Sequence, residues 1–385
     1  MNNLISILFV GVNLLLAFLC LINIQQVNKS GNRWFGIFIL CIFFLNTEEI
    51  LGIARLKIEN DIVSAVLSLP CFMFAPAFYF TILYFITPNR SWKIKDYFHL
   101  FTLAILYILF FIYIVLYQNS FFKEQSANFI FKLLQGNFLD LLLCVQVVYY
   151  CTLSWIKLKK HEKNILLFSS NIEKVDLRWL KYIMVCFIIM AFFFISNLLY
   201  NIPDHYFIII NAFYLVGFFI IAYFSMKQEE IYPFTKDQKD EIIDIVITDI
   251  LEKQPKKLIE DGKLEELKNT LLEIMETRKP FLDCELSLVK LASMLDISSH
   301  QLSHLINTGF DENFYQFINR YRIEEAKKLI LDEKMSHLSF QGIAFEVGFN
   351  SKSVFNTTFK KCTGLTPSDY KSSNQQEIVV KMSSD

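Results

Sequence analysis

One pattern of apolar and polar residues occurs twice in the last third of this chain, and it restricts that part to paired helices. The second copy lies in residues 338–370, with the sequence LSFQGIAFEVGFNSKSVFNTTFKKCTGLTPSDY. Its apolar residues recur at helical spacing on both sides of Gly348, and glycine readily takes the positive φ angle of a tight turn. Ser351 follows the turn and can cap a second helix through its hydroxyl. The stretch therefore predicts a helix-turn-helix with a polar outer face.

The first copy lies in residues 288–306, with the sequence LVKLASMLDISSHQLSHLI. Up to the turn, the apolar residues of the two copies pair as Leu291 with Ile343, Ala292 with Ala344, Leu295 with Val347, and Ile297 with Phe349. Beyond the turn the copies align once one additional residue, Asn350, is allowed in the second. An internal repeat of this kind predicts two similar helical units, where a lone match would be weak evidence.

The two units and the segment between them resemble the DNA-binding domain of the AraC/XylS family of transcription regulators. The resemblance covers approximately residues 279–371, and its most specific part is the run from Gly348 to Tyr370. The segment Tyr315–Ile330 (YQFINRYRIEEAKKLI) is similar to the helix that connects the two motifs in the family. The resemblance implies that one helix of each motif enters the major groove of double-stranded DNA, in two successive grooves about 34 Å apart.

By position, the residues that face bases in the family fall on a short polar set in each motif. They are Ser299, His300, Ser303 and His304 in the first motif, and Lys352, Ser353, Asn356 and Thr357 in the second, with Lys360 as a phosphate contact. Lysine suits guanine, asparagine suits adenine, and hydroxyls are less selective. Any exposed helix face is polar, so the duplication of the motif is what makes this set a candidate interface.

Two departures from the family bear on DNA binding. The family often has arginine at the positions of His304 and Thr357, so its base preferences do not transfer to this chain. Residues 278–371 also carry 12 Lys and Arg against 11 Asp and Glu. Because DNA-binding domains are usually strongly basic, we expect modest non-specific affinity and dependence on a dimer or on two adjacent sites.

The first 226 residues have a different character, because nearly all of the apolar excess lies there. The whole chain is 54% hydrophobic and has 40 phenylalanines, and a membrane-spanning helix needs about 20 mostly apolar residues. Seven stretches meet this requirement: Leu4–Ile24, Trp34–Ala54, Ile62–Thr87, Tyr97–Tyr117, Phe138–Ile156, Trp179–Tyr200 and Tyr206–Met226. They predict a bundle of seven transmembrane helices, the third of them kinked by Pro70 and Pro76.

The loops give the orientation of this bundle. If the C-terminal domain binds DNA it lies in the cytoplasm, and an odd number of spans then puts Met1 outside. The loops that become cytoplasmic hold 11 Lys and Arg residues and the outer loops hold four. This asymmetry follows the positive-inside rule, so charge and function independently predict the same topology, in the cytoplasmic membrane.

Polar residues within the predicted spans are candidates for sensing a signal. Asn46, Glu48, Glu49, Asn197 and Asn211 come from three spans and fall toward the outer side of the bilayer when about 1.5 Å is counted per residue. Carboxylates inside a membrane are costly and are often functional. The alternative is that these residues make hydrogen bonds between helices, or mark an interfacial helix end.

The expected fold is all-α, with a seven-helix transmembrane bundle followed by a cytoplasmic domain that contains two helix-turn-helix motifs. The expected domains are a transmembrane sensor-like domain (1–226), a helical linker (227–278), the DNA-binding domain (279–371) and a polar tail (372–385), which we expect to be disordered from Asn374 onward. In the linker, Leu264, Leu267, Leu271 and Ile274 recur at heptad spacing. They predict a helix that packs on its own domain or, alternatively, one that dimerises.

We therefore interpret the chain as a membrane-anchored, one-component transcription regulator. The alternative is a transporter or receptor whose C-terminal helices form a regulatory or protein-binding tail. The sequence has no Gly-rich phosphate loop, no nucleophile elbow and no cysteine pair with metal-ligand spacing, so we expect neither an enzyme nor a cofactor or metal site. The expected partners are double-stranded DNA, the lipid bilayer and an unknown signal ligand, with RNA polymerase and a second copy of the chain as further candidates.

Overall fold

The computed structural model describes residues 2–22, 28–45, 69–88, 90–118, 137–172, 177–200 and 261–382, together with single positions between 212 and 223. Within these residues every regular element is a helix, which confirms the all-α class there. The one departure in this part of the chain is an isolated antiparallel bridge between Ser169 and Ser287. The chain divides into two compact units, the first made of Met1–His161 and Leu177–Ile231 and the second of Glu162–Asp176 and Tyr232–Asp385.

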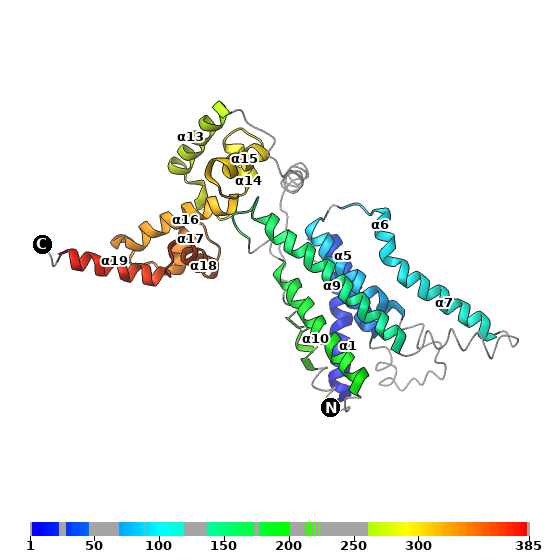
Figure 1. Cartoon of the computed structure of the whole chain (residues 1–385). Coiled ribbons are helices and arrows are strands. Elements are labelled where there is room, and N and C mark those ends of the chain that lie inside the picture. The colour runs from blue at the N-terminus through cyan, green and yellow to red at the C-terminus, as the bar shows by residue number, and fades with distance from the viewer. Residues whose placement is uncertain are drawn as a thin grey trace. The chain divides into compact units, whose positions relative to one another are not determined.

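In the N-terminal unit, helices occupy the first six of the predicted spans (Figure 1). They are α1 (Asn2–Ile22), α2 (Lys29–Leu45), η1 with α5 (Leu69–Met73 and Phe74–Ile86), α6 with η2 and α7 (Ile94–Tyr97, Phe98–Leu100 and Phe101–Gln118), α9 (Asn137–Ile165) and α10 (Arg178–Tyr200). Residues 46–54 of the second span and 62–68 of the third lie outside the described part. Most of the seventh predicted span falls outside the described residues.

Two helices in the described part are long and apolar enough to cross a membrane, Leu69–Ile86 and Leu141–Ile165, and the apolar helix Ile7–Ile22 is shorter. The first of these is mostly buried inside the protein and the second is mostly not. The seven-helix transmembrane bundle therefore stays a prediction.

Aromatic rings form the core of the N-terminal unit. Phe38 of α2 is fully buried, and its ring packs against Phe74 and Phe78 of α5 and Phe187 of α10, with ring centroids 5.0–5.2 Å from its own. Such offset and edge-to-face pairs add to the energy of simple burial. They hold α2, α5 and α10 together, although these helices are far apart in the sequence.

The two prolines of the third predicted span lie where a helix begins. Pro70 is in the 3-10 turn η1, and Pro76 is in the first turn of α5. The first turn of a helix has N–H groups without helical acceptors, so a proline costs little there. The change from the 3-10 turn η1 to the α-helix α5 thus falls between the two prolines, as their positions in the sequence suggest.

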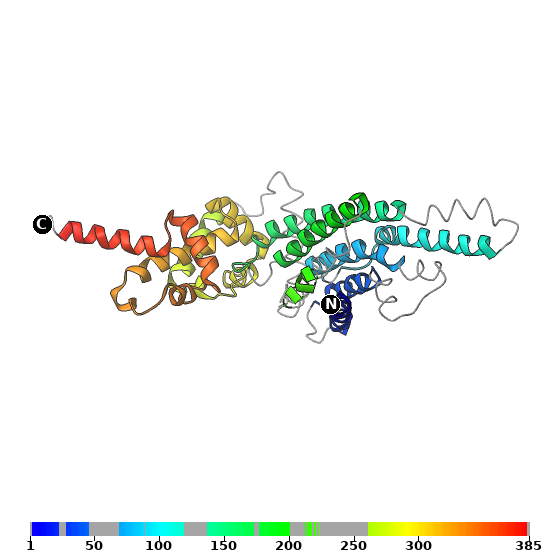
Figure 2. The same ribbon diagram turned by 90° about the horizontal axis from the view of Figure 1, so that it is seen from below.

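The C-terminal unit is built around one helix, α16 (Phe314–Leu331), as Figures 1 and 2 show. Helix α16 contacts each of its neighbours α15, α17, α18 and α19. The other elements are α13 (Asp261–Thr277), η4 (Pro280–Leu282), α14 (Leu288–Met294), α15 (Ser299–Phe310), η5 (Glu333–Met335), α17 (Phe340–Glu346), α18 (Lys352–Thr363) and α19 (Pro367–Met382). Because α16 lies between the two helix pairs, its side chains can fix their mutual orientation.

Helix α13 carries the heptad-spaced residues of the linker, and it packs on its own domain. Leu271, Ile274 and Met275 are buried, and α13 contacts α15. Lys268 also lies over the ring of Phe310, with its Nζ 5.6 Å from the ring centroid. These contacts use the apolar face that a dimerising helix would need, so they support packing of α13 on its own domain rather than dimerisation.

The prediction of a disordered tail from Asn374 is wrong for most of that segment. Helix α19 begins at Pro367 and continues to Met382. Thr366 accepts a hydrogen bond from the backbone N–H of Asp369 and donates one to its carboxylate, which caps the helix start. Proline suits the first helical position, and no glycine or proline follows before Met382. The polar composition alone therefore gave the wrong answer.

Candidate nucleic-acid interface

The two motifs have the same turn geometry, residue for residue. Gly348 has a φ of 89°, and Asp296, which occupies the corresponding position of the first motif, has a φ of 54°. After each turn, a backbone N–H bonds back into the first helix, from Ile297 to Ala292 at 3.2 Å and from Phe349 to Ala344 at 2.9 Å. The predicted repeat and the predicted role of Gly348 are both confirmed.

Serine caps begin all four helices of the two motifs. Ser287 and Ser298 accept hydrogen bonds from backbone N–H groups at the starts of α14 and α15, and Ser339 and Ser351 do so for α17 and α18. Ser298 also forms a reciprocal capping box with Gln301. These caps define where each helix begins, and so they set which residues of α15 and α18 point outward.

On α15 the predicted base-facing residues are not all presented to solvent. His300, Ser303 and His304 are partly exposed. Ser299 is only 1% exposed, because it lies in the first turn of α15 on the side that faces the domain. The outward face of this helix therefore consists of the two histidines and Ser303.

On α18 the predicted residues form one continuous polar face. Lys352, Ser353, Thr357 and Lys360 are exposed, and Asn356 is partly exposed. The hydroxyl of Thr357 donates to the backbone carbonyl of Ser353 at 2.9 Å, so it presents only acceptor capacity to a partner. The face thus offers one amide, two hydroxyls and two ammonium groups.

The opposite side of α18 holds this face in place. Phe355 and Phe359 are completely buried, with ring centroids 5.6 Å apart. They belong to one apolar core with Ile323 and Ala326 of α16 and with the apolar residues of α17. Burying two phenylalanines fixes the rotation of α18 about its axis, so Asn356 and Thr357, which lie between them, face away from this core, whereas Thr358 is buried with them.

The residues predicted to sense a signal lie mostly outside the described part of the chain. Asn46, Glu48, Glu49 and Asn211 belong to undescribed segments. Asn197 lies within α10, but the placement of its side chain is not described. Their proposed role stays a prediction.

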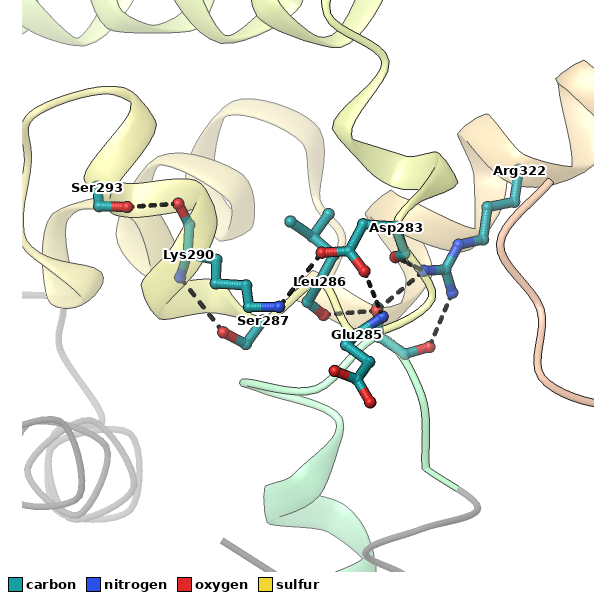
Figure 3. Close-up of polar contacts among 8 residues, drawn as sticks. Asp283, Glu285, Leu286, Ser287, Lys290, Ser293 and Arg322 are labelled. Carbon is teal, nitrogen blue, oxygen red and sulfur yellow. Dashed lines mark hydrogen bonds and ion pairs between the residues drawn. The ribbon is translucent and has the colours of Figure 1, made fainter. Parts of the chain in front are cut away.

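One residue at the centre of the C-terminal unit was not among the predicted site residues. Arg322 of α16 is 1% exposed, and Figure 3 shows its guanidinium reaching toward the loop before α14. It donates hydrogen bonds to the backbone carbonyls of Phe281 at 2.7 Å and Asp283 at 2.9 Å. Burial lowers the pKa of Arg322 to about 10, so the side chain still carries its charge at neutral pH.

The sequence contains a pattern from which the burial of Arg322 could have been predicted. Ile318, Arg322, Ala326 and Ile330 recur at intervals of four, and all are buried. A charged residue in the middle of an apolar row on one helix face must find internal partners. The spacing could therefore have identified Arg322 as a buried organising residue.

Comparisons with known proteins concern this C-terminal part. A family model described as a helix-turn-helix domain matches residues 291–373. The arabinose operon regulatory protein of Escherichia coli (strain K12) is 27% identical over 104 residues, which cover 26% of this chain and 35% of that protein. The uncharacterized transcriptional regulatory protein YesN of Bacillus subtilis (strain 168) is 35% identical over 79 residues, covering 20% and 21%. The chain thus spans about a third or less of the length of these relatives.

A solved structure is also similar to part of this chain. The C-terminal domain of the two-component response regulator yesN from Fusobacterium nucleatum is 32% identical, and the match covers 28% of this chain and 98% of that one with a TM-score of 0.25. The relatives are named as regulators, in agreement with the prediction that this chain is not an enzyme. The repeated motif, the capped helices and the relatives agree, and residues 291–373 are a helix-turn-helix domain of the AraC type.

Proposed function

We propose that this chain is a membrane-anchored, one-component transcription regulator that binds specific double-stranded DNA through α15 and α18. The observation that carries the proposal is the duplicated motif, in which each second helix buries its apolar side chains and turns a polar face outward. Helices of this kind enter successive major grooves on one side of a duplex. A signal received by the N-terminal unit then controls the DNA-binding domain.

The outer faces of α15 and α18 have the chemistry for reading bases. Lys352 suits guanine and Asn356 suits adenine, whereas Ser303, Ser353 and the histidines are less selective. We leave Ser299 out of this set because its side chain is buried. Lys360 lies two turns after Lys352 on α18, where an ammonium group can contact phosphate.

The nearly balanced charge of the domain favours specific contacts over general attraction to DNA. Lys352, Lys360 and Lys361 lie on α18 and Lys371 lies near the start of α19, so four positive charges are available beside the second motif. Because counterion release supplies most of non-specific binding, we expect a steep preference for the operator. A second copy of the chain or a second nearby site would add affinity.

Large exposed apolar side chains support the membrane anchor. Several helices of the N-terminal unit expose leucine, isoleucine, valine and phenylalanine side chains along their length. Examples are Leu15 and Phe18 in α1, Ile108 and Phe111 in α7, Val145 and Val148 in α9, and Ile188 and Phe192 in α10. Apolar surface of this extent is rare in water and is normal against lipid. With the positive loops on one side, it favours a cytoplasmic C-terminal domain.

For the signal site, the sequence pattern remains the support. Asn46, Glu48, Glu49, Asn197 and Asn211 are polar residues of predicted spans that fall toward the outer side of the bilayer. One of the two glutamates would face the bundle, since adjacent residues of a helix point about 100° apart. We propose that this glutamate lines a pocket for a cationic ligand or takes up a proton.

The DNA-binding role makes a direct prediction. Lys352→Ala and Asn356→Ala should each reduce specific affinity by about 1–3 kcal/mol, since each removes a contact to a base edge. Lys360→Ala should weaken all sequences by a similar factor and lower the salt dependence by about one ion. The measurement is fluorescence anisotropy of the detergent-solubilised full chain on selected operator DNA and on a scrambled duplex.

Lys334→Ala is the charge-matched control, because Lys334 is an exposed lysine of η5, outside both recognition helices. It should leave the ratio of operator to scrambled affinity unchanged. If Lys352→Ala and Asn356→Ala also leave that ratio unchanged, α18 does not read bases and the proposed interface is wrong.

A further inference from the structure

The C-terminal unit contains a segment from a distant part of the chain. Helix α9 ends at Ile165, and residues 162–176 belong to the C-terminal unit although the helices on either side of them, α9 and α10, are largely in the N-terminal unit. Within this segment Ile165 and Phe168 are each 2% exposed. These residues fall within the predicted transmembrane domain (1–226). Their two buried apolar side chains belong instead to the C-terminal unit.

Backbone carbonyls of the segment bind the starts of two helices. The N–H of Leu288, the first residue of α14, donates to the carbonyl of Phe168 at 3.0 Å, and the N–H of Tyr315, in the first turn of α16, donates to that of Leu166 at 3.1 Å. The first N–H groups of a helix have no acceptors within the helix and carry partial positive charge. The segment thus caps both the first motif and the central helix.

Ser170 extends these contacts to the buried arginine. Arg322 donates from Nη1 to the carbonyl of Ser170 and from Nη2 to its Oγ, both at 3.1 Å, and the Ser170 hydroxyl donates to the carbonyl of Leu286 at 2.6 Å. Ser170 is 3% exposed. In Figure 3 the pale green ribbon of this segment passes beside the loop that carries Asp283 and Leu286.

Arg322 connects this segment to both helix-turn-helix motifs. On one side it bonds the carbonyls of Phe281 and Asp283, which lead into α14. On the other side its guanidinium carbon lies 5.6 Å from the centre of the Phe349 ring, directly after the turn of the second motif. A change in the partners of this one side chain therefore acts on both motifs.

We propose that residues 166–170 are an intramolecular ligand of the DNA-binding domain, and that their docking couples the membrane helices to DNA binding. This inference rests on the proposed function. The segment is covalently continuous with α9 and α10, so a signal that displaces these helices pulls on it directly. Lys352, Ser353 and Thr357 are exposed while the segment is docked, so the docked form is the one competent to bind DNA.

Withdrawal of the segment should weaken DNA binding. It would leave two helix starts without their capping carbonyls and a buried guanidinium without two of its acceptors. Each loss is costly in a protein interior. The relative orientation of the two motifs, which a pair of major grooves requires, would no longer be held.

Two adjacent serines provide a matched test. Ser170→Ala removes the hydroxyl that bonds Arg322 and Leu286, whereas the Ser169 hydroxyl bonds only within its own turn, to Asn171. In the full chain, reconstituted in lipid nanodiscs, Ser170→Ala should reduce operator affinity roughly threefold to tenfold, since a hydrogen bond to a charged group is lost. Ser169→Ala should stay within about twofold of the wild type, in the range of ordinary surface substitutions.

A disulfide tests whether the segment is docked in the membrane-embedded chain. Ser169 and Ser287 are directly opposite each other in the antiparallel bridge, where Cα atoms are about 4.5–5.5 Å apart and within disulfide range. The test chain carries Ser169→Cys and Ser287→Cys, with Cys284→Ser to remove a nearby thiol and a protease site inserted between residues 232 and 260. After cleavage, a disulfide between positions 169 and 287 should keep the two fragments joined on a non-reducing gel. With only one of the two new cysteines present, the fragments should separate. The oxidised chain should bind operator DNA at least as tightly as the reduced one.

The outcomes separate this proposal from the proposed function. If the wild-type chain binds operator DNA but the fragments separate and both serine variants bind alike, the docked segment is not a coupling device and the DNA-binding role stands. The coupling is also refuted if the oxidised chain loses operator binding. If the wild-type chain shows no preference for any DNA sequence, the proposed function fails and this inference fails with it.

Discussion

Replacing Gly348 with alanine should destabilise the C-terminal unit by about 2–4 kcal/mol, from a strained backbone and a steric overlap together. At a φ of 89°, any residue with a Cβ atom is strained. The added Cβ would also lie 2.5 Å from the carbonyl oxygen of Phe281 and 2.9 Å from that of Leu282. These are backbone atoms, which cannot rotate away, so the loop before α14 would have to shift.

Gly364 provides the matched control, because it has a similar φ of 79° and open space around it. Gly364→Ala should cost only the backbone strain, about 1 kcal/mol. Hydrogen–deuterium exchange of α16 and α18 amides in the solubilised full chain measures both variants, since each 1.4 kcal/mol of destabilisation raises the opening equilibrium about tenfold. Equal exchange in the two variants would show that the close approach to Phe281 is not a real constraint.

Replacing Arg322 with methionine should be the other large loss, about 2–4 kcal/mol. Methionine can fill much of the volume, but it leaves the buried carbonyl oxygen of Phe281 and the partly buried one of Asp283 without this donor. Removing the buried charge offsets part of this cost, because the desolvation that lowers the pKa of Arg322 is relieved. The same exchange experiment should show early opening at the start of α14 and in the middle of α16.

Arg320, two residues earlier on the same helix, provides the control, because replacing it removes the same charge from a site that is not buried. It makes a salt bridge to Glu312 at 3.0 Å, but its side chain is 41% exposed. Arg320→Met should therefore cost less than about 1 kcal/mol, as surface ion pairs do. If Arg322→Met and Arg320→Met increased hydrogen–deuterium exchange in the C-terminal unit by the same amount, the buried hydrogen bonds of Arg322 would not be what stabilises that unit.

The helix pairs of the C-terminal unit could be predicted because their determinants are local. Apolar spacing, a glycine at the turn and a serine at each helix start all lie within a few residues of one another. Asp296 shows the limit of this reasoning, since its left-handed conformation follows only from its alignment with Gly348. Aspartate adopts such angles more readily than most residues, but its identity alone does not require them.

The internal partners of Arg322 could not be predicted in the same way. Three of its acceptors are backbone carbonyls, those of Phe281 and Asp283 before α14 and that of Ser170, about 150 residues away in the chain. No side-chain pattern in the sequence encodes a carbonyl acceptor. The docked segment could have been recognised from the sequence. Ile165, Leu166, Leu167 and Phe168 form an apolar run within an otherwise polar, basic loop, and such a run needs a core to enter.

The N-terminal half was predicted from bulk composition, which identifies apolar helices well but places single polar residues poorly. Helices occur at the first six predicted spans. The depth of Asn46, Glu48 and Glu49 depends on where each span begins in the bilayer, and hydropathy does not define that position to one turn. Burial of the polar side chains Asn13 and Ser154 on α1 and α9 likewise depends on which helices pack against them.

Whether one chain both resides in the membrane and reads DNA can be measured by crosslinking DNA to the tagged full chain in cells and sequencing what co-purifies with the membrane fraction. We expect a small set of discrete genomic sites, enriched in the membrane fraction over the soluble one and lost when Lys352→Ala and Asn356→Ala are combined. Recovery of the chain in the soluble fraction, or sites that persist unchanged in the double variant, would contradict it.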